Sequence, residues 1–359
     1  MYMLACLFGW LAVWALVEAL SAARPRLVWA AYALCAALGL YTHSFAAFVV
    51  LAANVWAVLL FVMDERRRQR TLLPWLAANA AVIALSLPWL LGITQQQGQG
   101  WWVWIEQRYG TPRLSDLLWL PVDFSLGVIR PVSKWLTLVP FAGFAAAFLW
   151  GLIPPSRNGE RGWWRSGGRE WACAVILASV PTLAVFLLAQ FRPMFVLRYM
   201  VPFMPAFALL AGRGFGRMRH AVPRWGLTAL YLAGVAAALV VVHSGMHKED
   251  WRGAANFLAS RAEPGAVVFL VDEDINIPFE FYYRQPAELH PVWRGHTSDE
   301  DLSTRVDEVA ANAQEFWLVV SHTDNDSLEQ YLRRFASVAE RHEFRAISVI
   351  RFRHGGSSP

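Results

Sequence analysis

Two short stretches of the sequence combine imidazole, guanidinium and aromatic side chains that could bind an anionic ligand. His43 lies in "GLYTHSFAAF", where a polar tripeptide separates two apolar runs. An ionisable side chain at membrane depth is costly and therefore marks a candidate functional site. Arg192, Arg198 and Tyr199 lie in "FRPMFVLRYM", and guanidinium groups bind phosphate through paired hydrogen bonds. Two alternatives stay open: His43 caps a helix, and the arginines only reach ordinary lipid phosphate.

A longer connection, residues 94–134, adds aromatic and acidic side chains. Trp101 and Arg108 stand in "GWWVWIEQRYG", where aromatic faces and a cation could hold a sugar ring and a phosphate. Tryptophans also anchor chains at the membrane interface without binding a ligand. Glu106, Asp116 and Asp123 are carboxylates that could deprotonate an acceptor hydroxyl, although no catalytic residue is identified. Asp116 follows a serine in "RLSDLLWL", which equally favours helix capping.

These residues lie in or between apolar runs of the sequence, so the elements that these runs form must position them. The chain of 359 residues is 56% apolar and 16% charged, too apolar for one water-soluble globule. A membrane core of ~30 Å is crossed by about 20 helical residues. We therefore expect a multi-pass α-helical membrane protein with about eight transmembrane helices. The runs are residues 2–20, 27–41, 44–62, 72–93, 135–153, 171–190, 199–212 and 225–243.

The charge distribution predicts the topology of these helices. Residues 1–243 contain 20 basic and 8 acidic residues, whereas residues 244–359 contain 12 and 19. Fourteen of the basic residues lie in every second connection, within residues 24–26, 66–70, 157–169 and 213–224. The positive-inside rule places these connections in the cytoplasm and both termini outside. This placement indicates topology and argues against nucleic acid as a partner.

Residues 244–359 form a second domain in this interpretation. The helix-like "DWRGAANFLASRA" alternates with the β-rich "AVVFLV" and "EFWLVVS", which predicts a small extracytoplasmic α/β domain. Neither GxGxxG nor a P-loop occurs, and Cys6, Cys35 and Cys173 lie in apolar runs without CxxC spacing. We therefore expect no cofactor and no metal.

The connection 94–134 is expected to lie along the membrane surface.

Three segments together carry a resemblance to a known family. "LGLYTHSFAAFVVLAAN", "RYMVPFMPAFALLAGRGF" and "DWRGAANFLASRAEPGAVVFL", in this order, resemble the bacterial family 39-type glycosyltransferases of the GT-C superfamily. These are relatives of protein O-mannosyltransferases and lipid A aminoarabinose transferases. The similarity runs the length of the chain and rests on the order of the segments and on the matching topology.

The resemblance implies a function in the cell envelope. A sugar would pass from a polyprenyl-phosphate donor to a lipid, glycan or protein acceptor at the outer face of the bacterial inner membrane, with polyprenyl phosphate leaving the anomeric carbon. Arg192 and Arg198 would bind the donor phosphate, and His43 would reach the same cavity. Tyr199, Trp101 and Arg108 complete the expected substrate-binding set.

The resemblance also bears on which part of the enzyme this chain represents. The family's catalytic aspartate lies in a first outer loop, upstream of the segment that "MYMLACLFGW" resembles. We therefore expect the chain to be the C-terminal two-thirds of such an enzyme, without that loop. Two other functions stay open: a non-catalytic membrane protein that binds lipid-linked glycans or acts as a scaffold, and a transporter. The transporter is the less favoured of the two, because the runs lack central charges and paired, interrupted segments.

Overall fold

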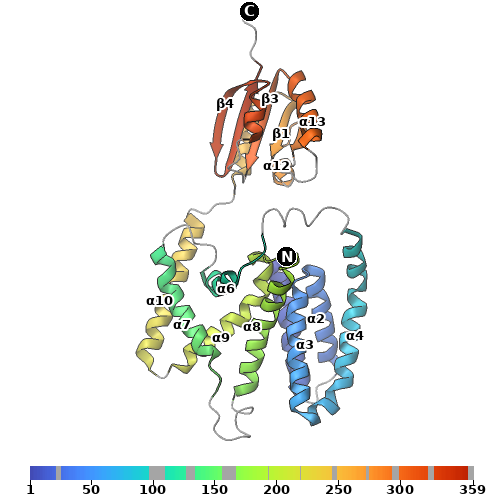
Figure 1. Cartoon of the computed structure of the whole chain (residues 1–359), viewed down its shortest axis with the longest axis vertical. Coiled ribbons are helices and arrows are strands. Elements are labelled where there is room, and N and C mark those ends of the chain that lie inside the picture. The colour runs from blue at the N-terminus through green and yellow to red at the C-terminus, as the bar shows by residue number, and fades with distance from the viewer. Residues whose placement is uncertain are drawn as a thin grey trace, which may run out of the picture. The chain divides into compact units, whose positions relative to one another are not determined.

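The protein divides into two compact units, Met1–Val241 and Val242–Pro359 (Figure 1). The computed structural model describes residues 1–21, 26–96, 110–126, 134–155, 167–192, 194–218, 220–244, 249–271, 275–292, 299–321 and 327–354.

The first unit is helical. A helix covers each of the eight predicted apolar runs, although the seventh run begins with a 3-10 segment. Among the described residues, one further helix lies in the connection 94–134. The helices are α1 (Tyr2–Ser21), α2 (Arg26–Thr42), α3 (Ala46–Met63), α4 (Glu65–Gln96), α6 (Leu114–Leu126), α7 (Lys134–Leu152), α8 (Arg169–Leu188), η2 (Leu197–Phe203), α9 (Met204–Arg217) and α10 (Ala221–Ser244).

Four helices in the described part of the chain are long and apolar enough to cross a membrane. They are α1, α3, α8 and the segment Glu65–Gly92 of α4. This supports a membrane protein, but it does not support the expected eight spans. Two of the remaining helices are short for a straight span, which requires about 20 residues: α2 has 17 residues and α9 has 14.

The helices of this unit pack as neighbours in space. α1 packs against α2 and α3, α2 against α4, and α3 against α8, while α9 joins α7 and α8 (Figure 1). Because successive helices run in opposite directions, the α2–α3 turn and η2 lie at one end, with the start of α1. The starts of α4 and α8 lie at the other end, with the end of α1.

A polar network ties α2, α3 and α4 together inside the apolar unit. The Tyr32 hydroxyl donates to Asn79 Oδ1 at 2.9 Å and accepts from Asn54 Nδ2 at 2.8 Å. Trp75 Nε1 donates to Asn54 Oδ1 at 2.8 Å. Tyr32 is fully buried. Polar side chains within apolar helices satisfy one another across helix boundaries, so this network fixes the relative rotation of the three helices.

α7 and α9 approach closely because each helix places a glycine against the backbone of the other. A Cβ added at Gly214 would overlap the carbonyl oxygen of Ala147, and one added at Gly151 would overlap that of Leu210. Arg213 and Arg217 then cap the end of α7: each guanidinium donates to the carbonyl oxygen of Ile153, at 2.9 and 2.8 Å.

The second unit is a five-stranded α/β domain, as the alternation of patterns predicted. Its elements are α11 (Trp251–Arg261), β1 (Ala266–Val271), α12 (Asn276–Tyr282), β2 (Ala287–Val292), α13 (Asp299–Asn312), β3 (Glu315–Ser321), α14 (Ser327–Leu332), β4 (Ser337–Phe344) and β5 (Ile347–Arg353). The strand order is β2-β1-β3-β5-β4. β1 pairs in parallel with β2 and β3, and β5 pairs antiparallel with β3 and β4.

Both faces of this sheet are covered. One apolar core packs α11 and α12 on the sheet, and a second packs α13 and α14. The central strand β3 is therefore almost continuously buried, which explains why "FWLVV" is apolar at every position instead of alternating.

Candidate functional site

An imidazole–aromatic cluster of Tyr2, His43, Phe45 and Tyr199 lies at one end of the helical unit. The His43 ring centroid is 5.1 Å from that of Tyr2 and 5.1 Å from that of Tyr199. The Phe45 ring is 5.4 Å from His43 and 5.5 Å from Tyr199. These residues come from the start of α1, the α2–α3 turn and η2. The structure therefore brings together two of the sequence stretches that could bind an anionic ligand.

His43 is held by the backbone of its own turn. The backbone N–H of Phe45 donates to His43 Nδ1 at 3.2 Å. This contact lies within the turn, and no side chain of the described residues caps the start of α3. Since Nδ1 accepts a hydrogen bond, the neutral ring carries its proton on Nε2. The half-buried imidazole thus combines an occupied acceptor with a donor on the opposite side of the ring.

Arg198 extends the cluster with a positive charge. Its guanidinium carbon lies 5.5 Å from the centre of the Tyr199 ring, and its side chain is exposed. η2 is fixed to α1, because Trp10 Nε1 donates to the carbonyl oxygen of Pro202 at 2.9 Å. Pro202 has no N–H to donate, which favours a short 3-10 segment over a regular helix here. Arg198, Tyr199 and His43 are therefore neighbours in space.

The other predicted site residues are not shown to join this cluster. Arg192 is exposed just after α8. Asp116 caps α6: its Oδ2 accepts from the backbone N–H of Arg113 at 2.8 Å, and its own N–H donates to the Arg113 carbonyl at 2.9 Å. Asp123 is half-buried on the same helix. Trp101, Glu106 and Arg108 lie outside the described residues.

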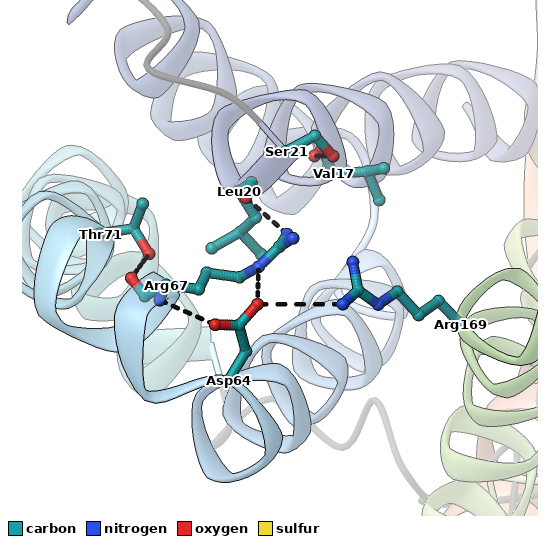
Figure 2. Close-up of polar contacts among 7 residues, drawn as sticks. All are labelled: Val17, Leu20, Ser21, Asp64, Arg67, Thr71 and Arg169. Carbon is teal, nitrogen blue, oxygen red and sulfur yellow. Dashed lines mark hydrogen bonds and ion pairs between the residues drawn. The ribbon is translucent and has the colours of Figure 1, made fainter. Parts of the chain in front are cut away.

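A second charged group, which sequence reasoning did not single out, lies at the opposite end of the helical unit. Figure 2 shows the Asp64 carboxylate between the guanidinium groups of Arg67 and Arg169. Asp64 Oδ2 is 3.4 Å from Arg67 Nε and 3.9 Å from Arg169. Arg67 also donates to the Leu20 carbonyl oxygen at 2.6 Å. The available signal was a single aspartate directly before the run "ERRRQR".

The two arginines determine the protonation of Asp64. Burial alone would raise the pKa of this carboxyl. The hydrogen bonds and charge of Arg67, together with the charge of Arg169, outweigh burial and hold the pKa below its ordinary range. Asp64 is therefore ionised at neutral pH and joins the end of α3 to α4 and α8 electrostatically.

Two cavities border α1. The larger, about 680 Å³, lies between α1 and α9 and extends from Cys6 to Arg213. The smaller, about 490 Å³, lies between α1, α3, α8 and α9 and includes Arg67 and Arg169. No member of the imidazole–aromatic cluster lines either of these two cavities.

Comparisons with known proteins do not identify a family. No protein-family model matches the chain, and no curated protein is significantly similar to it in sequence. Among the described residues, no group of three or more His, Cys, Asp or Glu side chains could hold a metal ion. The resemblance to GT-C glycosyltransferases remains a prediction.

Proposed function

We propose that this chain binds a polyprenyl-phosphate sugar donor at the imidazole–aromatic cluster and acts in sugar transfer of the GT-C type. The acceptor would be a lipid, glycan or protein at the outer face of a bacterial inner membrane. The observation that carries the proposal is the convergence of His43, Arg198 and Tyr199 at one end of an apolar helical unit.

The chemistry of these side chains suits a lipid-linked sugar phosphate. Arg198 can donate two hydrogen bonds to the phosphate, and Arg192 on the same connection adds a second positive charge. The faces of Tyr2 and Tyr199 offer apolar contact to a sugar ring. The Nε2–H of His43 can donate to the phosphate oxygen that leaves the anomeric carbon, which stabilises the departing polyprenyl phosphate.

The charge distribution supports the orientation that the proposal requires. Arg66, Arg67, Arg169 and Arg213 all lie toward the end opposite the cluster, so the positive-inside rule assigns that end to the cytoplasm. The cluster and the C-terminal α/β domain are then periplasmic. In this proposal all eight apolar helices cross the membrane: α2 ends in a turn below the surface, and η2 continues into α9.

A second candidate function is binding of a lipid-linked glycan without catalysis. One observation favours it: the Asp116 carboxylate is engaged in capping α6, and the described part of the cluster contains no carboxylate. A general base for an acceptor hydroxyl would then have to come from outside the described residues.

Donor binding tests the proposal. Binding of undecaprenyl phosphate to the full chain in nanodiscs should weaken by about tenfold or more in Arg198→Ala, since hydrogen bonds to charged groups contribute about 1.5–3 kcal/mol. Arg224→Ala is a matched control: its guanidinium also lies over the next aromatic ring, 5.3 Å from Trp225, but on α10 at the other end. Equal affinities of Arg198→Ala and the wild type would refute the phosphate assignment.

Turnover separates the two candidate functions. A transferase releases polyprenyl phosphate from its sugar-linked donor when an acceptor is present. A binding protein retains the donor without releasing it.

A further inference from the structure

The smaller cavity, at the end opposite the imidazole–aromatic cluster, has one polar end and an otherwise apolar wall. Its wall includes the tryptophans Trp10, Trp14 and Trp56. Its polar residues are at helix ends that meet: Ser21 ends α1, Arg67 lies in the first turn of α4, and Arg169 and Glu170 begin α8. A volume of about 490 Å³ lies in the range of small-molecule sites.

The polar end of the cavity carries both positive and negative side chains, namely Arg67, Arg169 and Glu170. Two guanidinium groups, those of Arg67 and Arg169, lie 3.4 and 3.9 Å from the single carboxylate of Asp64, and both arginines line the cavity (Figure 2). Glu170 also lines the cavity and, among the described residues, forms no ion pair. Because α8 starts here, the positive end of its dipole adds to the attraction for an anion.

We propose that this cavity binds a phospholipid whose head group carries a primary ammonium, of the phosphatidylethanolamine class. The phosphate lies against Arg67 and Arg169, the ammonium donates to the Glu170 carboxylate, and an acyl chain runs between the tryptophans. This site is separate from the cluster and does not depend on sugar transfer. The charge pattern distinguishes among lipids: Glu170 repels a head group of net negative charge, and a quaternary ammonium has no hydrogen to donate to it.

Lipid competition on the full chain tests this assignment. The purified protein in a neutral maltoside detergent is titrated with phosphatidylethanolamine, phosphatidylglycerol and phosphatidylcholine of identical acyl chains, and bound lipid is counted by native mass spectrometry. The wild type should bind the ethanolamine lipid about threefold better than the other two, the size expected of a partly exposed ion pair.

Two variants and two matched controls locate the effect. Glu170→Gln should remove the preference for the ethanolamine lipid, and Arg169→Gln should reduce binding of all three lipids. Glu65→Gln and Arg66→Gln change exposed charges at the same end but outside the cavity, and should behave as the wild type. Equal binding of the three lipids by the wild type overturns the proposal, and so does an equal effect of Glu170→Gln and Glu65→Gln.

Tryptophan quenching gives a readout that keeps all charged residues in place. Phosphatidylethanolamine with brominated acyl chains quenches tryptophans in contact with it. Trp14→Phe should lower the quenched fraction of fluorescence, whereas Trp225→Phe should not. These two tryptophans are equally exposed, at 61% and 63%, but Trp225 lies outside the cavity. Equal quenching in both variants overturns the placement of the acyl chain.

Discussion

At the residue scale, the two ring nitrogens of His43 have different roles. Nδ1 accepts the Phe45 N–H and so supports the α2–α3 turn, which leaves the Nε2–H to donate to a ligand. His43 can therefore stabilise the turn and bind the proposed donor at the same time. A substitution that keeps the acceptor but not a donor at the position of Nε2 separates the two roles.

We expect His43→Asn to keep the melting temperature and to weaken binding of undecaprenyl phosphate. The asparagine oxygen can still accept the Phe45 N–H, but the donor at Nε2 is repositioned, and a lost hydrogen bond corresponds to roughly two- to tenfold in affinity. His220→Asn, an exposed histidine at the opposite end, should change neither quantity. Unchanged affinity in His43→Asn would mean that His43 only stabilises the α2–α3 turn.

Glu315 gives the C-terminal domain a defined pH dependence. Its Oε2 lies 2.6 Å from Arg351 and 3.1 Å from Arg353. Burial alone would raise the pKa of Glu315, but the hydrogen bonds and charges of both arginines outweigh burial and lower it. A lowered native pKa stabilises the fold fully above the unfolded value of about 4.3, and the stabilisation is lost as pH falls through the native pKa.

Glu315→Gln should therefore lower the free energy of unfolding of residues 242–359 by about 1 kcal/mol at pH 7, and by progressively less below about pH 4.3. Urea denaturation across this pH range measures the difference. Glu280→Gln removes an exposed carboxylate on α12 that forms no ion pair among the described residues, and serves as the control. A difference that grows toward low pH would contradict the assignment.

At the element scale, the contact between α7 and α9 depends on glycine. Gly214→Ala should destabilise the helical unit by about 1–3 kcal/mol, because the new methyl group overlaps the Ala147 carbonyl and the helices must separate. Gly212→Ala lies on the same helix with no atom within 4 Å of the added Cβ, and should be neutral or slightly stabilising. Thermal melting of the full chain in detergent compares the two. Equal melting temperatures would mean that the two helices are not in close contact.

The positions of the helices were predicted from the sequence more accurately than their lengths. Apolar runs mark the segments that can be buried away from water, and a helix covers every predicted run. However, α4 begins at Glu65, not at residue 72, because "ERRRQR" consists of good helix formers that continue the helix into polar surroundings. In the C-terminal domain, the strand order could not be read from periodicity, which reports buried faces but not which strands are neighbours.

Individual residues of the candidate site could be proposed from the sequence, but the contacts between them could not. His43 was predicted because an ionisable side chain at membrane depth is costly, and Arg198 and its neighbour Tyr199 because guanidinium groups bind phosphate. Their mutual contact could not be predicted, since it arises when η2 folds onto α1 through Trp10 and Pro202. The role of Asp64 was missed for the same reason: its partner Arg169 is distant in the sequence and adjacent only in the fold.

At the scale of the whole molecule, the helical unit carries two chemically different ends. One combines an imidazole, tyrosines and an exposed arginine, which we assign to a polyprenyl-phosphate donor. The other collects arginines around Asp64 beside a cavity, which we assign to an ordinary membrane phospholipid. These two assignments require that a polyprenyl phosphate binds at the first end and not at the second.

Photo-cross-linking tests this requirement most directly. The full chain in proteoliposomes is irradiated with a polyprenyl phosphate that carries a diazirine next to the phosphate, and labelled peptides are mapped by mass spectrometry. We expect labelling in the α2–α3 turn around His43 and in residues 194–203, reduced in Arg198→Ala and unchanged in Arg224→Ala. Labelling concentrated around Arg67 and Arg169, or spread evenly over both ends, would contradict the assignment of the donor to the imidazole–aromatic cluster.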